Sequence, residues 1–126
     1  MLGYALFGSN DVARAHAFYD EVLALLGAMP VMQFGDTKVW GTTGLEFGVG
    51  KPFNGAPATA GNGTMVALNA TTRAQVDAVH AKALALGGTD EGAPGIRGED
   101  PNGFYAAYFR DLDGNKLAIF RMGPPD

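Results

Sequence analysis

GYALFGSNDVARAHAFYDEVLALLG, residues 3–27, is repeated in outline by TMVALNATTRAQVDAVHAKALALGG, residues 64–88. The two stretches align at an offset of 61 residues, and each begins with a short β-type segment, residues 4–7 and 65–68. Apolar residues at a spacing of three and four follow each segment, which is typical of a helix with one buried face. The sequence therefore predicts two related halves, each opening with a strand and a helix.

The ends of both helices carry recognisable signals. Residues 9–11, Ser-Asn-Asp, are cap candidates for the first helix, and Thr72 with Gln75 forms a capping box at the start of the second. Gly27 ends the first helix and residues 87–88, Gly-Gly, end the second, as C-cap residues do.

After each helix the apolar period changes from 3.6 to about 2, which predicts short strands. These segments are VMQF (31–34), TKVW (37–40), LEFGV (45–49), FYAAYF (104–109) and KLAIF (116–120). Each half is then a βαβββ module, and two modules packed on one mixed sheet bury more than either alone. We expect an α+β fold in a single domain, with module 1 at about 1–50, a Gly/Pro/Ala-rich linker at 50–63 and module 2 at about 64–122.

Composition excludes several classes of function. The 126 residues are 47% hydrophobic and 17% charged with a net charge of −4, so nucleic acid is not an expected partner. Cysteine is absent, which excludes disulfides, thiolate metal sites and a cysteine nucleophile. No apolar run approaches the ~18 residues of a membrane span, and no basic leader opens the chain. We expect a cytoplasmic protein with no membrane partner.

The paired modules, DVARAHAFYDEVLALLG at 11–27 and FRDLDGNKL at 109–117 resemble the vicinal oxygen chelate superfamily. That superfamily contains glyoxalases, extradiol dioxygenases, fosfomycin-resistance enzymes and bleomycin-resistance proteins. The resemblance covers nearly the whole chain and implies a cup-shaped sheet with the helices on its outer face. It does not choose among the activities, because fold and function are separable.

In metal-dependent members the first and last strands of each module supply the metal ligands, usually His and Glu. The resemblance puts Tyr4, Glu46, Met65 and Ala118 at these positions, with Glu46 and Ala118 equivalent. Only Glu46 is a good donor, whereas a metal site needs at least two or three protein ligands. We therefore expect no metal and no other cofactor.

The two histidines, His16 and His80, lie on the predicted helices and away from the cup. His80 falls on the buried stripe, so we expect a hydrogen-bonded core residue, and His16 lies just off that stripe and is expected in solvent.

The resemblance also implies which side chains line the cup and bind a ligand: Tyr4, Glu46, Met65, Ala118 and, by likeness to the fosfomycin-resistance enzymes, Tyr108. Alternation along the same strands adds Leu6, Phe104 and Phe120, and Trp40 is expected on one wall. For the large apolar members, the alternative is ordinary core packing. For Glu46, a register slip of one residue would turn the carboxylate to solvent.

Residues 91–103, EGAPGIRGEDPNG, have two interpretations. Their length and glycine content are typical of a lid that would bring Arg97, Glu99 and Asp100 to the cup mouth. The alternative is that GIRG belongs to a strand completing the second module.

Three functions remain open. The first is a metal-independent protein that binds a small molecule in an aromatic cup, as bleomycin-resistance proteins do. The second is a lyase, isomerase or dioxygenase-type enzyme with Glu46 as its catalytic base or metal ligand, and the third is an interaction module without a pocket. A homodimer is expected, because few lysines protect the sheet edges.

Overall fold

A computed structural model describes all residues, 1–126. Its elements, in chain order, are β1 (Ala5–Gly8), α1 (Val12–Ala24), β2 (Met29–Phe34), β3 (Thr37–Gly41), β4 (Phe47–Gly50), β5 (Met65–Asn69), α2 (Arg73–Ala85), β6 (Thr89–Arg97), β7 (Phe104–Arg110) and β8 (Lys116–Met122). The two βαβββ modules of the sequence are thus both present.

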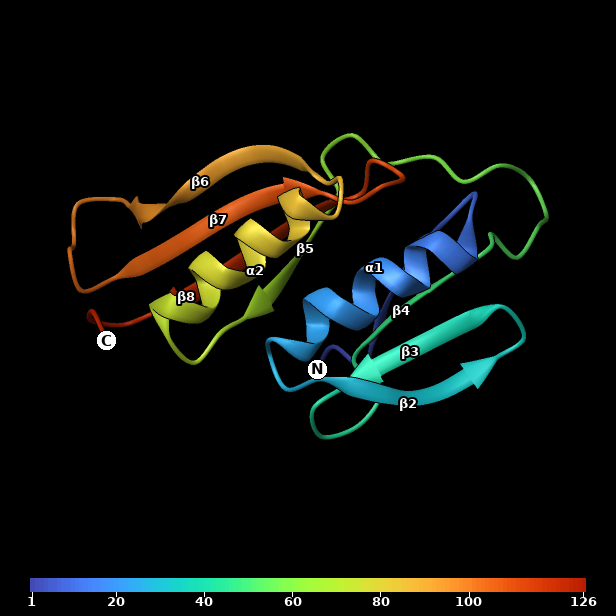
Figure 1. Ribbon diagram of the computed structural model, residues 1–126, viewed down its shortest axis with the longest axis horizontal. Helices are drawn as coiled ribbons and strands as arrows, with labels where there is room; N and C mark the ends of the chain where they lie inside the picture. The colour runs from blue at the N-terminus through green and yellow to red at the C-terminus, as the bar shows by residue number, and fades with distance from the viewer.

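The modules have the same sheet topology. Strand order is β1-β4-β3-β2 in the first sheet and β5-β8-β7-β6 in the second. In each sheet the first and last strands of the module pair in parallel, and the other pairs are antiparallel. The α+β class and tandem modules are confirmed, and the predicted mixed sheet consists of two four-stranded sheets lying side by side along the long axis (Figure 1).

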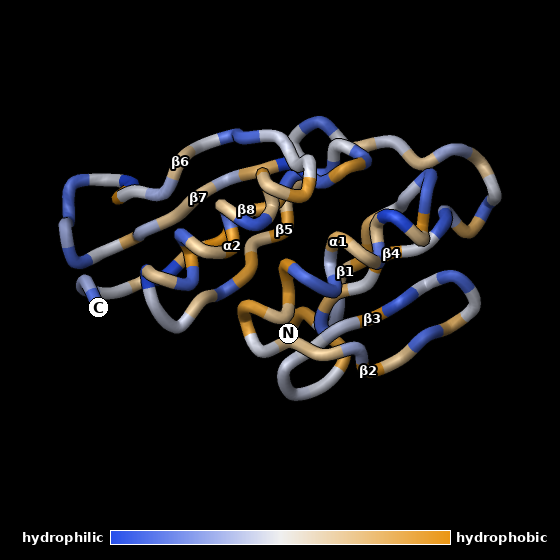
Figure 2. The backbone as a smooth tube through the Cα atoms, in the orientation of Figure 1, coloured by the Kyte–Doolittle hydropathy of each residue, from blue (hydrophilic) through white to orange (hydrophobic).

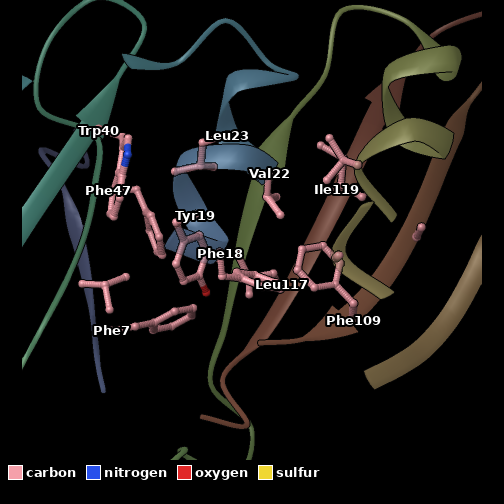
Figure 3. Close-up of a cluster of buried hydrophobic side chains, with 14 of the residues drawn as sticks. Phe7, Phe18, Tyr19, Val22, Leu23, Trp40, Phe47, Phe109, Leu117 and Ile119 are labelled. Carbon is pink, nitrogen blue, oxygen red and sulfur yellow. The ribbon is translucent and has the colours of Figure 1, made fainter. Parts of the chain in front are cut away.

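Both helices cover the same side of the two sheets, and one hydrophobic core joins them. Tyr19 and Val22 of α1 and Val79 of α2 are fully buried, as are Phe109 and Leu117 from the second sheet. Figure 3 shows the Phe18 and Tyr19 side chains between the strands of the two modules. Burial of this cluster holds the modules together, since apolar area removed from water stabilises by about 25 cal/mol per Å².

The helix starts are capped as the sequence predicts. Asp11 accepts a hydrogen bond from the Arg14 amide at 3.1 Å, and Thr72 accepts one from the Gln75 amide at 3.1 Å. In return, the Gln75 side chain accepts a hydrogen bond from the amide of Thr71. A capping box would use the amide of Thr72, which is one residue later. Neither helix is long and apolar enough to cross a bilayer.

Residues 91–103 are not a lid. Strand β6 extends to Arg97 and pairs with β7, so only residues 98–103 form a turn. The register of this ladder shifts between Asp90 and Gly92 and again between Gly92 and Gly95, and such shifts bend a strand. β6 is an edge strand of mostly hydrophilic or neutral residues (Figure 2), which explains why an apolar alternation did not mark it.

Candidate functional site

The side of each sheet that faces away from the helices, called here the helix-free face, carries the candidate site. On the first sheet this face forms an open pocket of about 800 Å³. Its lining includes Tyr4, Leu6, Phe7, Met32, Phe34, Val39, Leu45 and Phe53, with Asp36, Thr37 and Lys51 among the polar members. We call this the first-module pocket, and it has the size and apolar character of a small-molecule site.

Two glycines of β4 lie against side chains that line this pocket, and one of them, Gly50, belongs to the lining itself. A Cβ on Gly48 would lie 2.7 Å from Leu6 Cδ2 and 3.0 Å from Val39 Cγ2. A Cβ on Gly50 would lie 2.2 Å from Thr37 Oγ1. The neighbouring strands therefore already fill the space above both glycines, which is why β4 reaches the pocket without side chains of its own.

Large apolar side chains stand exposed around the pocket. Tyr4 is 55% exposed, Leu6 53% and Phe34 79%. Met32 and the linker residue Phe53 are exposed as well. These exposed apolar side chains gather on one face of the first sheet, and clusters of this kind are typical of interaction surfaces.

The second module places its predicted ligand-binding residues on its own helix-free face. Phe104 and Phe120 lie with ring centroids 5.3 Å apart, and Tyr108 pairs directly with Ala118 across β7 and β8. Met65, on β5, is 44% exposed. None of these residues lines the first-module pocket, so one chain distributes the predicted residues over two sheets.

Trp40 is placed differently from the prediction. It is 1% exposed and belongs to the core on the helix side of β3. Its indole Nε1–H donates to Asp20 of α1 at 2.9 Å. Thr37 and Val39, which point to the opposite side of the strand, line the pocket instead. Trp40 therefore fixes the helix to the sheet and does not form a wall.

Glu46 lies just before β4, and its carboxylate is occupied by its own loop. It accepts hydrogen bonds from the Thr42 amide, the Thr42 hydroxyl at 2.8 Å and the Thr43 amide at 3.3 Å. These hydrogen bonds, from the Thr42 amide above all, hold the pKa of Glu46 below its ordinary value of 4.5. A carboxylate with a lowered pKa is a weaker base, and Glu46 does not line the first-module pocket.

The strand register corrects one predicted equivalence. Leu6 pairs with Gly48 in the first module, and the repeat-related Ala67 pairs with Ala118 in the second. Ala118 is therefore equivalent to Gly48 and not to Glu46. The Glu46 position corresponds to Lys116, which pairs with Met65, so the two modules carry opposite charges at equivalent places.

The residues on these faces do not fit a metal. No group of three or more His, Cys, Asp or Glu side chains lies together anywhere in the chain. Of the four positions that the resemblance points to, only Glu46 offers a carboxylate, and that carboxylate already accepts three hydrogen bonds. The strand register allows two consistent choices for the last-strand positions, either Glu46 with Lys116 or Gly48 with Ala118. Neither choice adds a metal ligand to the four residues considered above.

Both histidines belong to the helix side. His80 is buried and lies 2.9 Å from the Asp90 carboxylate, as predicted for a hydrogen-bonded core residue. His16 is half-buried, and its Nε2 lies 2.8 Å from the carbonyl oxygen of Val49. The expectation that His16 stands in solvent is wrong, because β4 comes close enough to α1 to cover it.

Sequence reasoning missed several lining residues of the first-module pocket. Met32 and Phe34 lie two apart on β2, so strand alternation could have found them. Phe53 comes from the linker, where neither periodicity nor pairing gives a signal.

Comparison with solved structures identifies close relatives of this fold. A glyoxalase/bleomycin resistance protein from Albidiferax ferrireducens T118 is 36% identical, with a TM-score of 0.87 over 96% of this chain and 98% of that chain. A glyoxalase-related enzyme from Fulvimarina pelagi is 20% identical, with a TM-score of 0.73 over 96% and 87%. The fosfomycin resistance protein FosX from Listeria monocytogenes is 16% identical, with a TM-score of 0.69 over 96% and 92%.

The last two share the fold alone at these identities. No protein-family model matches the sequence. No curated protein sequence matches it.

Proposed function

Because the chain belongs to the glyoxalase/bleomycin resistance protein family of the vicinal oxygen chelate superfamily, we propose that it binds an organic small molecule on its helix-free faces and needs no metal to do so. The observation that carries the proposal is the first-module pocket: about 800 Å³, mostly apolar, and without a set of metal donors. In this reading the protein sequesters or carries its ligand.

The pocket favours binding over a purely structural role. A scaffold module would fill its interior with the aromatic residues of the strands, whereas Tyr4, Leu6 and Phe34 remain more than half exposed. Keeping so much apolar surface in water is unfavourable. A ligand or a second chain that covers it removes that penalty.

We further propose that the protein acts as a homodimer. All six residues of the edge strand β2 are exposed, including Val31, Met32 and Phe34. An apolar edge of this kind pairs readily with another chain. A second copy related by a two-fold axis could place the first-module pocket of one subunit against the second-module face of the other, and so bring the two sets of predicted residues into one site.

An enzymatic role for Glu46 is the weaker alternative. A general base must lie within about 3 Å of the proton it removes, or one water away. The Glu46 carboxylate accepts hydrogen bonds from Thr42 and Thr43, and Glu46 lies outside the pocket. Substrate would have to displace that loop before the carboxylate could act.

A binding experiment with and without metal tests the proposal. The fluorescent probe N-phenyl-1-naphthylamine is apolar and uncharged, so it reports on an apolar pocket. We expect it to bind with the same affinity after EDTA treatment and after incubation with Ni²⁺, Zn²⁺, Mn²⁺, Co²⁺ or Fe²⁺. Bound metal after desalting should stay far below one ion per chain, and tight stoichiometric uptake of any of them would refute metal independence.

Two neighbouring residues of β2 supply a matched control. Met32 lines the pocket and Val31 does not, although both are exposed to a similar degree. Met32→Ser should weaken binding of the probe about tenfold or more, since a buried apolar side chain contributes about 1.5 to 3 kcal/mol. Val31→Ser should leave the affinity unchanged, and equal effects of the two substitutions would place the probe elsewhere.

A further inference from the structure

Two cations flank one tyrosine on the helix-free face of the second module. The Arg97 guanidinium carbon lies 5.3 Å from the centroid of the Tyr108 ring, and the Lys116 Nζ lies 5.6 Å from it. These distances are typical of cation–π contacts. The three side chains come from β6, β7 and β8, so the sheet itself brings them together.

Neither cation has a carboxylate within 4.0 Å, in contrast to the helix side of the molecule. There Lys38 lies 2.8 Å from Asp20, and Lys82 lies 3.8 Å from Glu21. The chain as a whole carries a net charge of −4. Unpaired cations in an acidic protein, both half-buried, form a local positive patch that an anion would neutralise.

Arg97 is held in place for this role. Its Nη2 donates to the carbonyl oxygen of Ala93 at 2.7 Å, so the guanidinium folds back across its own strand. A Cβ on Gly92 or Gly95 would lie 3.2 Å from a guanidinium nitrogen. The two glycines at the irregular part of β6 therefore leave the room in which the guanidinium lies, and its remaining N–H groups are free for a ligand.

Acidic residues nearby do not serve as internal partners. Asp100 uses its side chain to cap its own turn, accepting from the Asn102 amide at 2.8 Å. Glu91 is taken by Arg110, with its carboxylate 2.5 Å from Nε. Lys116, moreover, stands where the first module has Glu46, so the second module has a cation at the position that carries a carboxylate in the first.

Resting on the proposed small-molecule binding and on the proposed two-fold dimer, in which this face meets the first-module pocket of the other subunit, we infer that the ligand is an amphipathic organic anion whose charged group, a carboxylate, sulfonate or phosphate, lies between Arg97 and Lys116 at Tyr108. Charge-assisted hydrogen bonds from guanidinium and ammonium suit such oxyanions. The apolar part of the ligand packs on the Phe104 and Phe120 rings, which share this face with Tyr108.

A pair of probes that differ in one anionic group tests the inference. The first is 8-anilinonaphthalene-1-sulfonate, and the second is N-phenyl-1-naphthylamine, the same ring system without the sulfonate. In fluorescence titrations of the full chain we expect the sulfonate to bind about tenfold more tightly. Its affinity should fall as salt is added, because part of the attraction is between exposed charges.

Substitutions locate the charged group. Arg97→Gln and Lys116→Gln should each lower the affinity for the sulfonate probe by roughly three- to tenfold. The affinity for the uncharged probe should stay within twofold. Arg14→Gln and Lys82→Gln remove the same charges from the helix side and should change neither probe. Thermal unfolding of each variant, followed by circular dichroism, verifies that the fold is retained.

The outcomes separate this inference from the proposed function. If both probes bind equally and the Gln variants change neither, the anion site is wrong while small-molecule binding stands. If neither probe binds the folded protein, the proposed function fails and this inference fails with it. If Lys82→Gln weakens the sulfonate as much as Lys116→Gln does, the effect is net charge alone and the site is again wrong.

Discussion

The Tyr19 hydroxyl donates to Asp111 Oδ2 at 2.6 Å and so joins the first helix to the acidic turn between β7 and β8. Tyr19 is fully buried and Asp111 is 5% exposed. Asp111 also accepts from the amides of Asp113 and Asn115 within its own turn, both at 2.9 Å. From the same turn, Asn115 donates to the Gly8 carbonyl at 3.1 Å. The acidic turn is therefore a joint between the modules.

Removing the Tyr19 hydroxyl should weaken this joint. Tyr19→Phe leaves a buried carboxylate oxygen with one donor fewer, and we expect the free energy of unfolding to fall by about 1 to 3 kcal/mol. Urea denaturation at neutral pH measures it. Tyr105→Phe is the matched control, because Tyr105 also donates to an aspartate, Asp77, at 2.6 Å but at an exposed site. Equal losses for the two variants would show that burial at the joint adds nothing.

Glu46 should stabilise its loop at neutral pH and stop doing so in acid. Its folded-state pKa lies below the ordinary 4.5, so the stabilisation is present above that value and is lost as the pH falls through the folded pKa. We expect Glu46→Gln to be less stable than the parent chain at pH 7, with the difference shrinking steadily below pH 4.5. Thermal unfolding over this range follows it, and a difference that grows toward low pH would contradict the assignment.

Tyr4 should contribute to both dimer assembly and ligand binding. Light scattering at micromolar concentration should give the mass of a dimer, and Tyr4→Ala should shift the protein toward monomer and weaken the uncharged probe, because Tyr4 is exposed at the pocket. Leu2→Ala removes an exposed apolar residue outside the pocket lining and serves as the control. A monomeric parent chain whose probe affinity still depends on Tyr4 would place the whole site within one subunit.

Adding one methyl group at Gly48 should overpack the strands that line the pocket. The new Cβ would meet Leu6 Cδ2 at 2.7 Å and Val39 Cγ2 at 3.0 Å, and overpacking of this kind costs about 1 to 3 kcal/mol. We expect Gly48→Ala to lower the unfolding midpoint. The double variant Gly48→Ala with Leu6→Ala should recover part of the loss, since Leu6 is half exposed and its removal frees the space. No recovery would mean that the clash is with the backbone of β3.

The repeat made the architecture predictable, and local capping chemistry located the helix starts. Asp11 and Thr72 cap their helices through their own side chains, so no distant contact is needed to find them. The equivalence of Glu46 and Ala118 was wrong by two residues, since the strand register makes Gly48 the counterpart of Ala118 and Lys116 the counterpart of Glu46. The last strands of the two modules share no motif that fixes their alignment in the sequence, so only the pairing with the first strands could set it.

Residues whose position depends on tertiary contact were beyond the sequence. Trp40 and Val39 are adjacent on β3, and the choice of Trp40 for the helix side goes with its contacts there, core packing and a hydrogen bond to Asp20 of α1. Phe53 reaches the pocket from a linker without regular structure. The exchange of Glu46 for Lys116 at one structural position became visible only with the strand register.

The exchange of Glu46 for Lys116 makes the two otherwise similar modules differ in charge at one position. Two identical modules would present matching halves to a bound molecule, which could then enter either way round with equal energy. Glu46 on one half and Lys116 at the corresponding place on the other carry opposite charges, so the two halves are not electrostatically equivalent. A molecule that bound across both halves would meet a negative charge on one and a positive charge on the other, so it would have one preferred orientation.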